Sequence, residues 1–237
     1  MNAQYVLGLG DDCLISSHRL AEWSGRAPGL EEDVALANIA LDQLGQARML
    51  LQHAGSLLGQ TEDELAYLRG EREFRNVQLA ELPNGDFGHT IARLLCFSSY
   101  QVALYSGLAA GPDPALAAIA GKAVKEVRYH RDYASQWTRR LGDGTAESHR
   151  RMAAGLAAVW PYTYELFEDR HAEPVPGLTR AGWLSDVGAV LTAATLEVPA
   201  DDGWHPTGGR DGLHTEALGY LLAEMQHLHR AHPGATW

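Results

Sequence analysis

Two long stretches with the hydrophobic spacing of α-helices each turn a carboxylate toward their apolar side. They are residues 122–137, KAVKEVRYHRDYASQW, and residues 31–50, EEDVALANIALDQLGQARML. Positions three and four apart share a helix face, so Glu126 falls on one stripe with His130. Asp42 falls in the same way on the apolar side of the other stretch. Because burying an unpaired carboxylate is costly, the pattern predicts a helical bundle with a polar centre.

Helical patterns separated by turn residues cover the rest of the chain, and no strand alternation of any length interrupts them. The expected long helices span about 3–24, 31–58, 87–110, 114–140, 145–169, 179–197 and 212–230. A short helical piece is expected near 62–68, and Pro161 should kink the helix over 145–169.

The first four long helices form two pairs joined by a long connection, which is the layout of a ferritin-like four-helix bundle. We therefore predict an all-α fold. It consists of a single ferritin-like helical domain over residues 1–237, in which about three additional C-terminal helices pack around the bundle.

The charge of the chain limits the partners that it can bind. The 237 residues include 30 Asp and Glu against 19 Lys and Arg, which gives a net charge of −11. Nucleic-acid surfaces need clustered basic residues, and the sequence has no basic run, so we expect no nucleic-acid partner. The longest uncharged window, residues 94–112, contains several serines and glycines. It fits a buried central helix better than a membrane span, so we expect no membrane association.

The cysteines and the N-terminus predict a cytoplasmic protein. Cys13 and Cys96 lie far apart in apolar helical patterns and form no CxxC motif, which is typical of reduced, structural thiols. The N-terminal residues MNAQYVLGLGDD contain no basic segment followed by an apolar run. We therefore expect no signal peptide.

Inward-facing acids in such a bundle raise the question of a metal site. Ferritin-like di-iron sites take a Glu from each of two helices and a Glu-x-x-His motif from each of the other two. The corresponding positions here are Asp12, Asp42, Gly45, Glu126, Tyr129 and His130. Both expected imidazoles are missing, His130 being one residue late, and the segment 87–112 supplies no carboxylate. We predict a degenerate di-iron site that holds no metal.

A cation on the same helix is the predicted partner of Glu126. Lys122 lies one turn before it on the same stripe, so its ammonium group can replace the charge of a metal. Tyr129, His130 and Tyr133 would complete a buried polar network by donating hydrogen bonds. Because removing one member of a buried ion pair typically costs about 3–5 kcal/mol, Glu126→Ala is predicted to be strongly destabilising.

Other motifs are weaker. Glu224-x-x-His227 faces away from the leucine stripe of the last helix, and Glu168-x-x-His171 runs off the end of an earlier one, so both are interpreted as solvent-facing. The segment TGGRDG, residues 207–212, precedes a helix and contains Arg210. A loop of this kind can bind phosphate, but a simple helix-entry loop is the preferred interpretation.

Five blocks of the sequence resemble a known family. They are DDCLISSHRLAEW, EEDVALANIALDQLGQARML, LPNGDFGHTIARL, KAVKEVRYHRDYASQW and GLHTEALGYLLAEMQHLHRAHPG. These blocks, which stand in order over nearly the whole chain, are similar to those of the C subunits of bacterial phenylacetyl-CoA monooxygenases, the ring 1,2-epoxidases of aerobic phenylacetate breakdown.

The resemblance implies a ferritin-like subunit without its own chemistry. Its expected partners are the catalytic A subunit, which carries the di-iron site, and further oxygenase and reductase subunits. Iron is expected in the A subunit, and FAD and an iron–sulfur centre in the reductase, which passes electrons from NADPH. No cofactor is expected in this chain. The lone chain is also expected to be able to form a homodimer.

Two alternatives stay open. The chain is an independent di-metal oxidase if Asp12, Asp42, Glu126 and His130 together hold metal, which predicts metal that survives dialysis. It is an acyl-CoA-binding module without chemistry if Arg210, beside the glycine-rich loop, contacts a CoA thioester, which predicts affinity in the absence of a partner.

Overall fold

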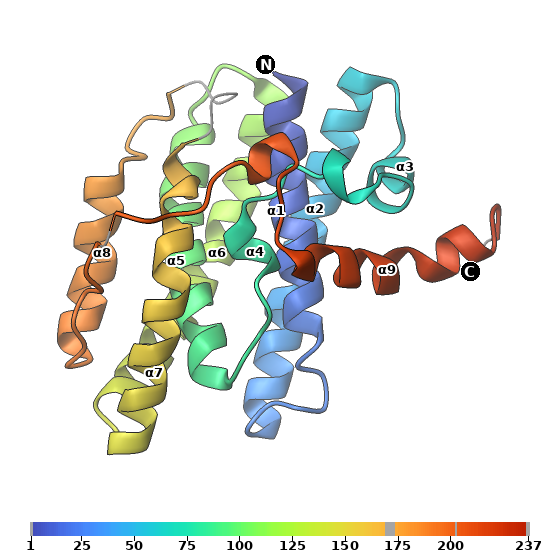
Figure 1. Ribbon diagram of the computed structural model, residues 1–237. Coiled ribbons are helices and arrows are strands. Elements are labelled where there is room, and N and C mark those ends of the chain that lie inside the picture. Colours follow the sequence, from blue (N-terminus) through green and yellow to red (C-terminus); the bar gives the residue numbers. More distant parts are fainter. Residues whose placement is uncertain (1, 169–173, 202, 236–237) are drawn as a thin grey trace. The chain divides into compact units, whose positions relative to one another are not determined.

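The computed structural model describes residues 2–168, 174–201 and 203–235, and every regular element within them is a helix (Figure 1). The all-α prediction is therefore confirmed for this part of the chain. The chain divides into two compact units. Unit 1 consists of Met1–Pro83 with Gly208–Trp237, and unit 2 consists of Asn84–Thr207. The prediction of one domain over residues 1–237 stays a prediction.

Unit 1 is built on a long helix pair, α1 and α2, which lie side by side (Figure 1). The short helix α4 packs on α1, whereas α9 returns from the C-terminal part of the chain and packs on α3 and η1. The elements are α1 (Ala3–Ala21), α2 (Leu30–Leu58), α3 (Glu62–Tyr67), η1 (Glu71–Glu73), α4 (Gln78–Glu81), η4 (Gly209–Asp211) and α9 (Glu216–Ala231).

The helix α1 is enclosed on all sides, because every residue from Tyr5 to Ser17 is buried. Consecutive helical residues point about 100° apart, so the adjacent acids Asp11 and Asp12 are both buried only because the helix has no solvent face there. A glycine brings α2 close. A Cβ at Gly10 would lie 2.8 Å from Cδ2 of Leu51.

Unit 2 is built on α5, which packs against α6, α7 and α8. Its elements are α5 (Phe87–Leu108), α6 (Pro114–Gly142), α7 (Ala146–Val159), η2 (Trp160–Thr163), η3 (Glu165–Phe167) and α8 (Arg180–Ala193). Asp86 and Asp113 cap α5 and α6 by accepting backbone N–H groups, as such residues commonly do. The indole of Trp183 on α8 donates a hydrogen bond of 3.0 Å to the carbonyl of Cys96 on α5.

Several predicted helix ends were wrong. The helix expected over 145–169 ends at Val159 and is followed by the 3₁₀ turns η2 and η3, since Pro161 has no N–H to continue the ladder. The helix expected from 212 begins at Glu216. The structure shows the two helix pairs of the predicted bundle, α1 with α2 and α5 with α6, within their own units. The four-helix bundle itself stays a prediction.

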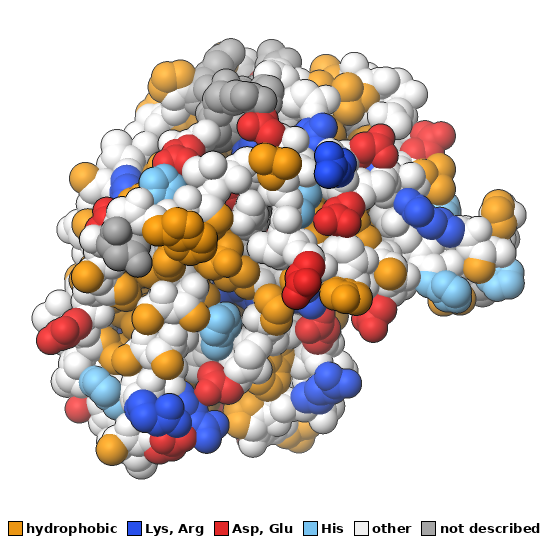
Figure 2. All heavy atoms as spheres, viewed as in Figure 1, with side chains coloured by type: hydrophobic (Ala, Val, Ile, Leu, Met, Phe, Trp, Pro, Cys, Tyr) orange, Lys and Arg blue, Asp and Glu red, His pale blue; other side chains and the backbone are white. Residues whose placement is uncertain are grey.

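Charged side chains are mixed on the surface. On the face shown in Figure 2, acidic and basic side chains lie next to one another. Glu147 in unit 2 is one example, since it pairs with both Arg150 and Arg151 at 2.8 and 2.6 Å. Such exposed pairs contribute little to stability.

Candidate functional site

Asp12, the predicted ligand position on the first helix, is buried and bound by an arginine. Nη2 of Arg210 lies 2.7 Å from Asp12 Oδ2, and Nη1 lies 3.0 Å from Oδ1. The backbone N–H of Val77 also donates to Oδ1, at 2.8 Å. Burial raises the pKa of Asp12 to about 6, although Arg210 and the Val77 hydrogen bond favour the ionised form. The carboxylate is thus one half of an internal ion pair.

Glycines make this ion pair possible. A Cβ at Gly8 on α1 would lie 2.8 Å from Nη1 of Arg210, so any other residue there would push the guanidinium away. The turn η4 that carries Arg210 lies between Gly208 and Gly212, whose φ angles are 99° and 81°. Glycine adopts this left-handed region at little cost. The glycine-rich loop therefore serves to aim Arg210 at α1.

Asp11 forms a separate ion pair with Arg69. Nη1 of Arg69 donates to Asp11 Oδ2 at 2.9 Å, and Nη2 of Arg69 also bonds Oδ1. The backbone N–H of Arg75 donates to Oδ2 at 2.8 Å. The guanidinium carbon of Arg69 lies 4.2 Å from the ring centroid of Phe74, a cation–π contact. Both members of the pair are buried.

A third buried carboxylate, Glu81 at the end of α4, binds the C-terminal segment to the N-terminal part of unit 1. Its Oε2 lies 2.8 Å from Nδ1 of His214, and its Oε1 accepts the backbone N–H of Thr215 at 2.6 Å. Asn76 also donates to Oε2, at 2.8 Å. The other ring nitrogen of His214 lies 3.1 Å from the carbonyl of Phe74. Oxygen atoms therefore face both ring nitrogens of His214.

The remaining predicted positions of unit 1 lie on α2. Asp42 is half-buried, and Gly45 is exposed. Among the residues that the structure describes, no atom from outside its own stretch of helix lies within 4 Å of the place that a Cβ of Gly45 would occupy. The position three residues after Asp42 therefore provides no metal ligand.

The predicted positions of unit 2 lie on α6. Glu126 is half-buried, His130 is buried and Tyr129 is exposed. Nζ of Lys122 lies 4.0 Å from Oε1 of Glu126, so the predicted contact exists at the limit of an ion pair. However, the Lys122 side chain is 63% exposed. The prediction of a buried Lys122–Glu126 pair was wrong, because the lysine reaches into solvent from the flank of the helix.

The sequence matches a known protein family over its whole length. Residues 1–237 match the protein family described as phenylacetic acid catabolic protein. The chain belongs to this family. Its sequence is 47% identical over 243 residues to the C subunit of 1,2-phenylacetyl-CoA epoxidase from Escherichia coli (strain K12), and the match covers 98% of each chain. The resemblance that the sequence blocks indicated is confirmed.

The residues of this chain do not fit a di-iron centre. Both oxygens of Asp12 accept hydrogen bonds from protein groups, so a metal would have to displace Arg210. Across residues 2–168, 174–201 and 203–235, no three or more His, Cys, Asp or Glu side chains stand close enough together to hold a metal ion. The helix α5 has neither Asp nor Glu in its sequence.

Arg210 does not suit the role of a CoA contact that the sequence suggested. Its side chain is buried, and its guanidinium nitrogens donate to Asp12 and to the carbonyl of Arg75. A phosphate would have to replace an internal carboxylate. The acyl-CoA alternative therefore loses its candidate residue.

Sequence inspection missed the other ionisable residues of this buried cluster: Asp11, Arg69, Glu81 and His214. One signal was available. Between Ala3 and Ser17, the doublet Asp11-Asp12 contains the only charged residues, and two adjacent acids in an otherwise uncharged helix indicate two buried cationic partners. The identity of those partners carried no local signal.

We expect Lys122→Ala to change the free energy of unfolding by no more than about 0.5 kcal/mol, as is usual for an exposed i,i+4 pair. Urea unfolding of the variant and the wild type measures the difference. A loss of about 3 kcal/mol or more would restore the buried network that the sequence predicted.

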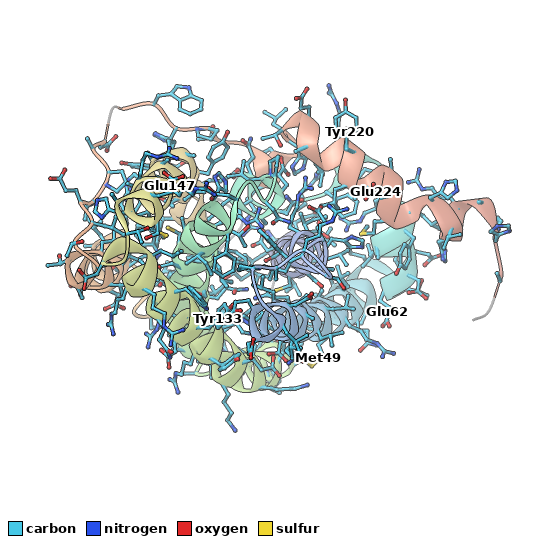
Figure 3. All side chains as sticks on the ribbon, turned by 90° about the horizontal axis from the view of Figure 1, so that it is seen from below. Met49, Glu62, Tyr133, Glu147, Tyr220 and Glu224 are labelled. Atoms are coloured by element: carbon cyan, nitrogen blue, oxygen red, sulfur yellow. The ribbon has the colours of Figure 1, made fainter. Side chains whose placement is uncertain are left out.

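The structure also shows where the residues of the weaker motifs and the two cysteines lie. Glu224 and His227 on α9 are exposed, as predicted, and Figure 3 shows Glu224 on that helix. The companion motif at Glu168 has its histidine, His171, outside the described residues. The side chains of Cys13 and Cys96 are both buried, and burial raises the pKa of Cys96 to about 12. Among the described helices, none is long and apolar enough to cross a membrane.

Proposed function

We propose that this chain is a non-catalytic structural subunit of a multicomponent di-iron monooxygenase. The complex would epoxidise the aromatic ring of phenylacetyl-CoA with O2 and NADPH, and this chain would support the catalytic A subunit. Family membership and the similarity to the C subunit of the E. coli epoxidase support the reaction. The observation that carries the non-catalytic role is the engagement of Asp12 by Arg210.

The cofactors of the reaction would lie in other subunits. Iron would be held by the A subunit, and FAD and the iron–sulfur centre by the reductase that accepts electrons from NADPH. The donor set of this chain supports the division, since the ligand positions on α2 and α6 include Gly45 and the exposed Tyr129. Its buried charges serve to hold the fold.

Reconstitution of the complex tests the proposal. Purified A subunit, reductase and the other subunits would be assayed for phenylacetyl-CoA epoxidation with and without this chain, and the chain would also be assayed alone. We expect activity only when the chain and the A subunit are both present. Turnover by the chain without the A subunit, or full activity of the other subunits without the chain, would contradict the proposal.

Variants at two predicted ligand positions distinguish a structural role of this chain from a catalytic one. We expect complexes that contain Asp42→Ala or Glu126→Ala to keep kcat within about twofold of the wild type, because neither carboxylate would touch the reacting atoms. The amount of A subunit in each complex would be matched by gel filtration before assay. A loss of about a hundredfold or more in correctly assembled complexes would instead place these carboxylates at a reaction centre.

A further inference from the structure

A cleft lies in unit 2 where α8 packs on both α5 and α6. Its volume is about 310 Å³, at the lower end of the range of small-molecule sites, which is about 300–1,000 Å³. Arg131, Ser135 and Arg139 line it from α6, Ser99 lines it from α5, and Asp186 lines it from α8. It is called the α6–α8 cleft below.

The α6 wall of the cleft is a row of hydrogen-bond donors. Arg131, Ser135 and Arg139 are spaced four residues apart in the sequence, so they share one side of the helix. The row is about 12 Å long at 1.5 Å per residue. A guanidinium group presents several N–H donors in one plane, a geometry that suits the oxygens of a phosphate. Two guanidinium groups with a hydroxyl between them can therefore bind one phosphate group together.

The donors of this cleft are not used by the fold. Ser99 and Ser135 are only 6% and 9% exposed, yet neither hydroxyl forms a hydrogen bond within the part of the chain that the structure describes. Arg139 forms no ion pair there either. Arg131 lies 3.2 Å from Asp132, but that pair is exposed and contributes little to stability. Because buried polar atoms nearly always have a partner, these groups are suited to a molecule that enters the cleft.

The charges around the cleft favour an anion that also carries hydroxyl groups. The helix α6 has six Lys and Arg against two Asp and Glu, although the chain as a whole has a net charge of −11. This concentration of positive charge attracts an anion to α6. Asp132 and Asp186, which also line the cleft, are both exposed. Their carboxylates repel a bare anion but accept hydrogen bonds from hydroxyl groups.

We propose that the α6–α8 cleft binds a small phosphate monoester that carries hydroxyl groups, such as a sugar phosphate. The phosphate accepts hydrogen bonds from Arg131, Ser135 and Arg139, and the hydroxyl groups of the sugar donate to Asp132 and Asp186. The small volume of the cleft suits a ligand of this size. The proposal adds a ligand site to the structural role proposed above and does not depend on that role.

Calorimetric titration of the full-length chain with ribose 5-phosphate, inorganic phosphate and ribose tests the proposal. A buffer at pH 8 keeps the phosphate monoester doubly charged, and about 50 mM salt limits screening of the arginines. We expect ribose 5-phosphate to bind with a Kd of about 0.1–1 mM. Inorganic phosphate should bind about tenfold more weakly, because it lacks the sugar hydroxyls, and ribose should not bind up to about 10 mM.

Three single variants separate the contacts that the proposal assigns. Arg139→Gln should weaken binding of ribose 5-phosphate about tenfold. Arg128→Gln is the matched control, because Arg128 is also an exposed arginine of α6 but does not line the cleft, and its affinity should stay within about twofold of the wild type. Asp186→Asn should weaken binding of ribose 5-phosphate but strengthen binding of inorganic phosphate, since it removes both a hydroxyl acceptor and a negative charge. All three positions are exposed, so the melting temperature should stay at the wild-type value.

Three outcomes would overturn the proposal. One is a wild-type chain that shows no saturable binding of ribose 5-phosphate up to about 10 mM. Another is an equal loss of affinity in Arg128→Gln and Arg139→Gln, which would show general attraction to a basic helix and no defined site. The third is equal binding of ribose 5-phosphate and inorganic phosphate that Asp186→Asn weakens in neither case, which would leave no recognition of the sugar. None of these results changes the outcome expected in the reconstitution assay, so the two proposals fail independently.

Discussion

Replacing Arg210 by methionine is expected to lower the free energy of unfolding by about 3–5 kcal/mol at pH 8, or the melting temperature by about 10 °C for a chain of this size. The substitution keeps most of the side-chain volume but removes the cation that pairs with the buried Asp12. A lone buried carboxylate cannot stay ionised at low cost. Thermal and urea unfolding at fixed pH measure the effect.

The dependence on pH identifies Asp12 as the cause. The pKa of Asp12 in the folded wild type, about 6 against an ordinary 3.8, is raised because burial outweighs Arg210. The folded state therefore binds a proton more readily than the unfolded state, so wild-type stability falls as pH rises from about 4 to about 6 and is then level with respect to this group. Without Arg210 the pKa rises further, so Arg210→Met should continue to lose stability above pH 6.

Two further variants control for this interpretation. Arg72→Met removes an exposed arginine of the same unit and should change stability by no more than about 0.5 kcal/mol. The double variant Asp12→Asn with Arg210→Met removes both charges. It should recover part of the lost stability, and its stability should no longer fall with pH above 6. Equal losses for Arg210→Met at pH 5 and pH 8 would contradict the assigned ion pair.

Replacing Asp11 by alanine is expected to cost a similar 3–5 kcal/mol, and equally at every pH from about 7 to 9, above the range in which Asp12 titrates. Arg69 would be left buried with its charge, and a guanidinium does not release its proton in this range. The backbone N–H of Arg75 would also lose its acceptor. Urea unfolding at several pH values measures both the size of the loss and its flatness.

The matched control for this prediction is Asp63→Ala, at an exposed acid of α3 in the same unit. It should change stability by no more than about 0.5 kcal/mol. Adding Arg69→Met to Asp11→Ala should restore part of the loss, because no unpaired charge then stays buried. Wild-type stability in the single variant Asp11→Ala would show that Arg69 finds water or another partner, and that the pair does not hold α3 to α1.

Local pattern predicted most of the helices because helix periodicity is a short-range property. The stretches that begin near Ala3, Leu30, Phe87 and Pro114 are helical over most of the predicted ranges. Pro161 was predicted to kink a helix that continues to residue 169, whereas the helix ends at Val159 and the chain forms 3₁₀ turns beyond it. Apolar spacing over a few residues does not distinguish these two helix types.

The sequence predicted that the centre would be polar, but it did not predict most of the residues that form it. Asp12 was predicted to be an inward-facing position of the bundle, and it is buried. Its partner Arg210 lies 198 positions away in the sequence, and no helical spacing relates the two. In the opposite case, the spacing of Lys122 and Glu126 correctly predicted a contact but not its exposure. Burial depends on which elements pack together, and local periodicity does not contain that information.

Iron analysis of the purified chain tests the central claim most directly, because Asp12 belongs either to Arg210 or to a metal. The chain would be expressed in iron-supplemented medium, alone and together with the A subunit, and its iron content measured after dialysis. We expect no stoichiometric iron in the lone chain, and iron in the complex that stays with the A subunit on separation. About two irons per isolated chain, the content of a di-iron centre, would contradict the account and make Asp42, Glu126 and His130 the first residues to replace.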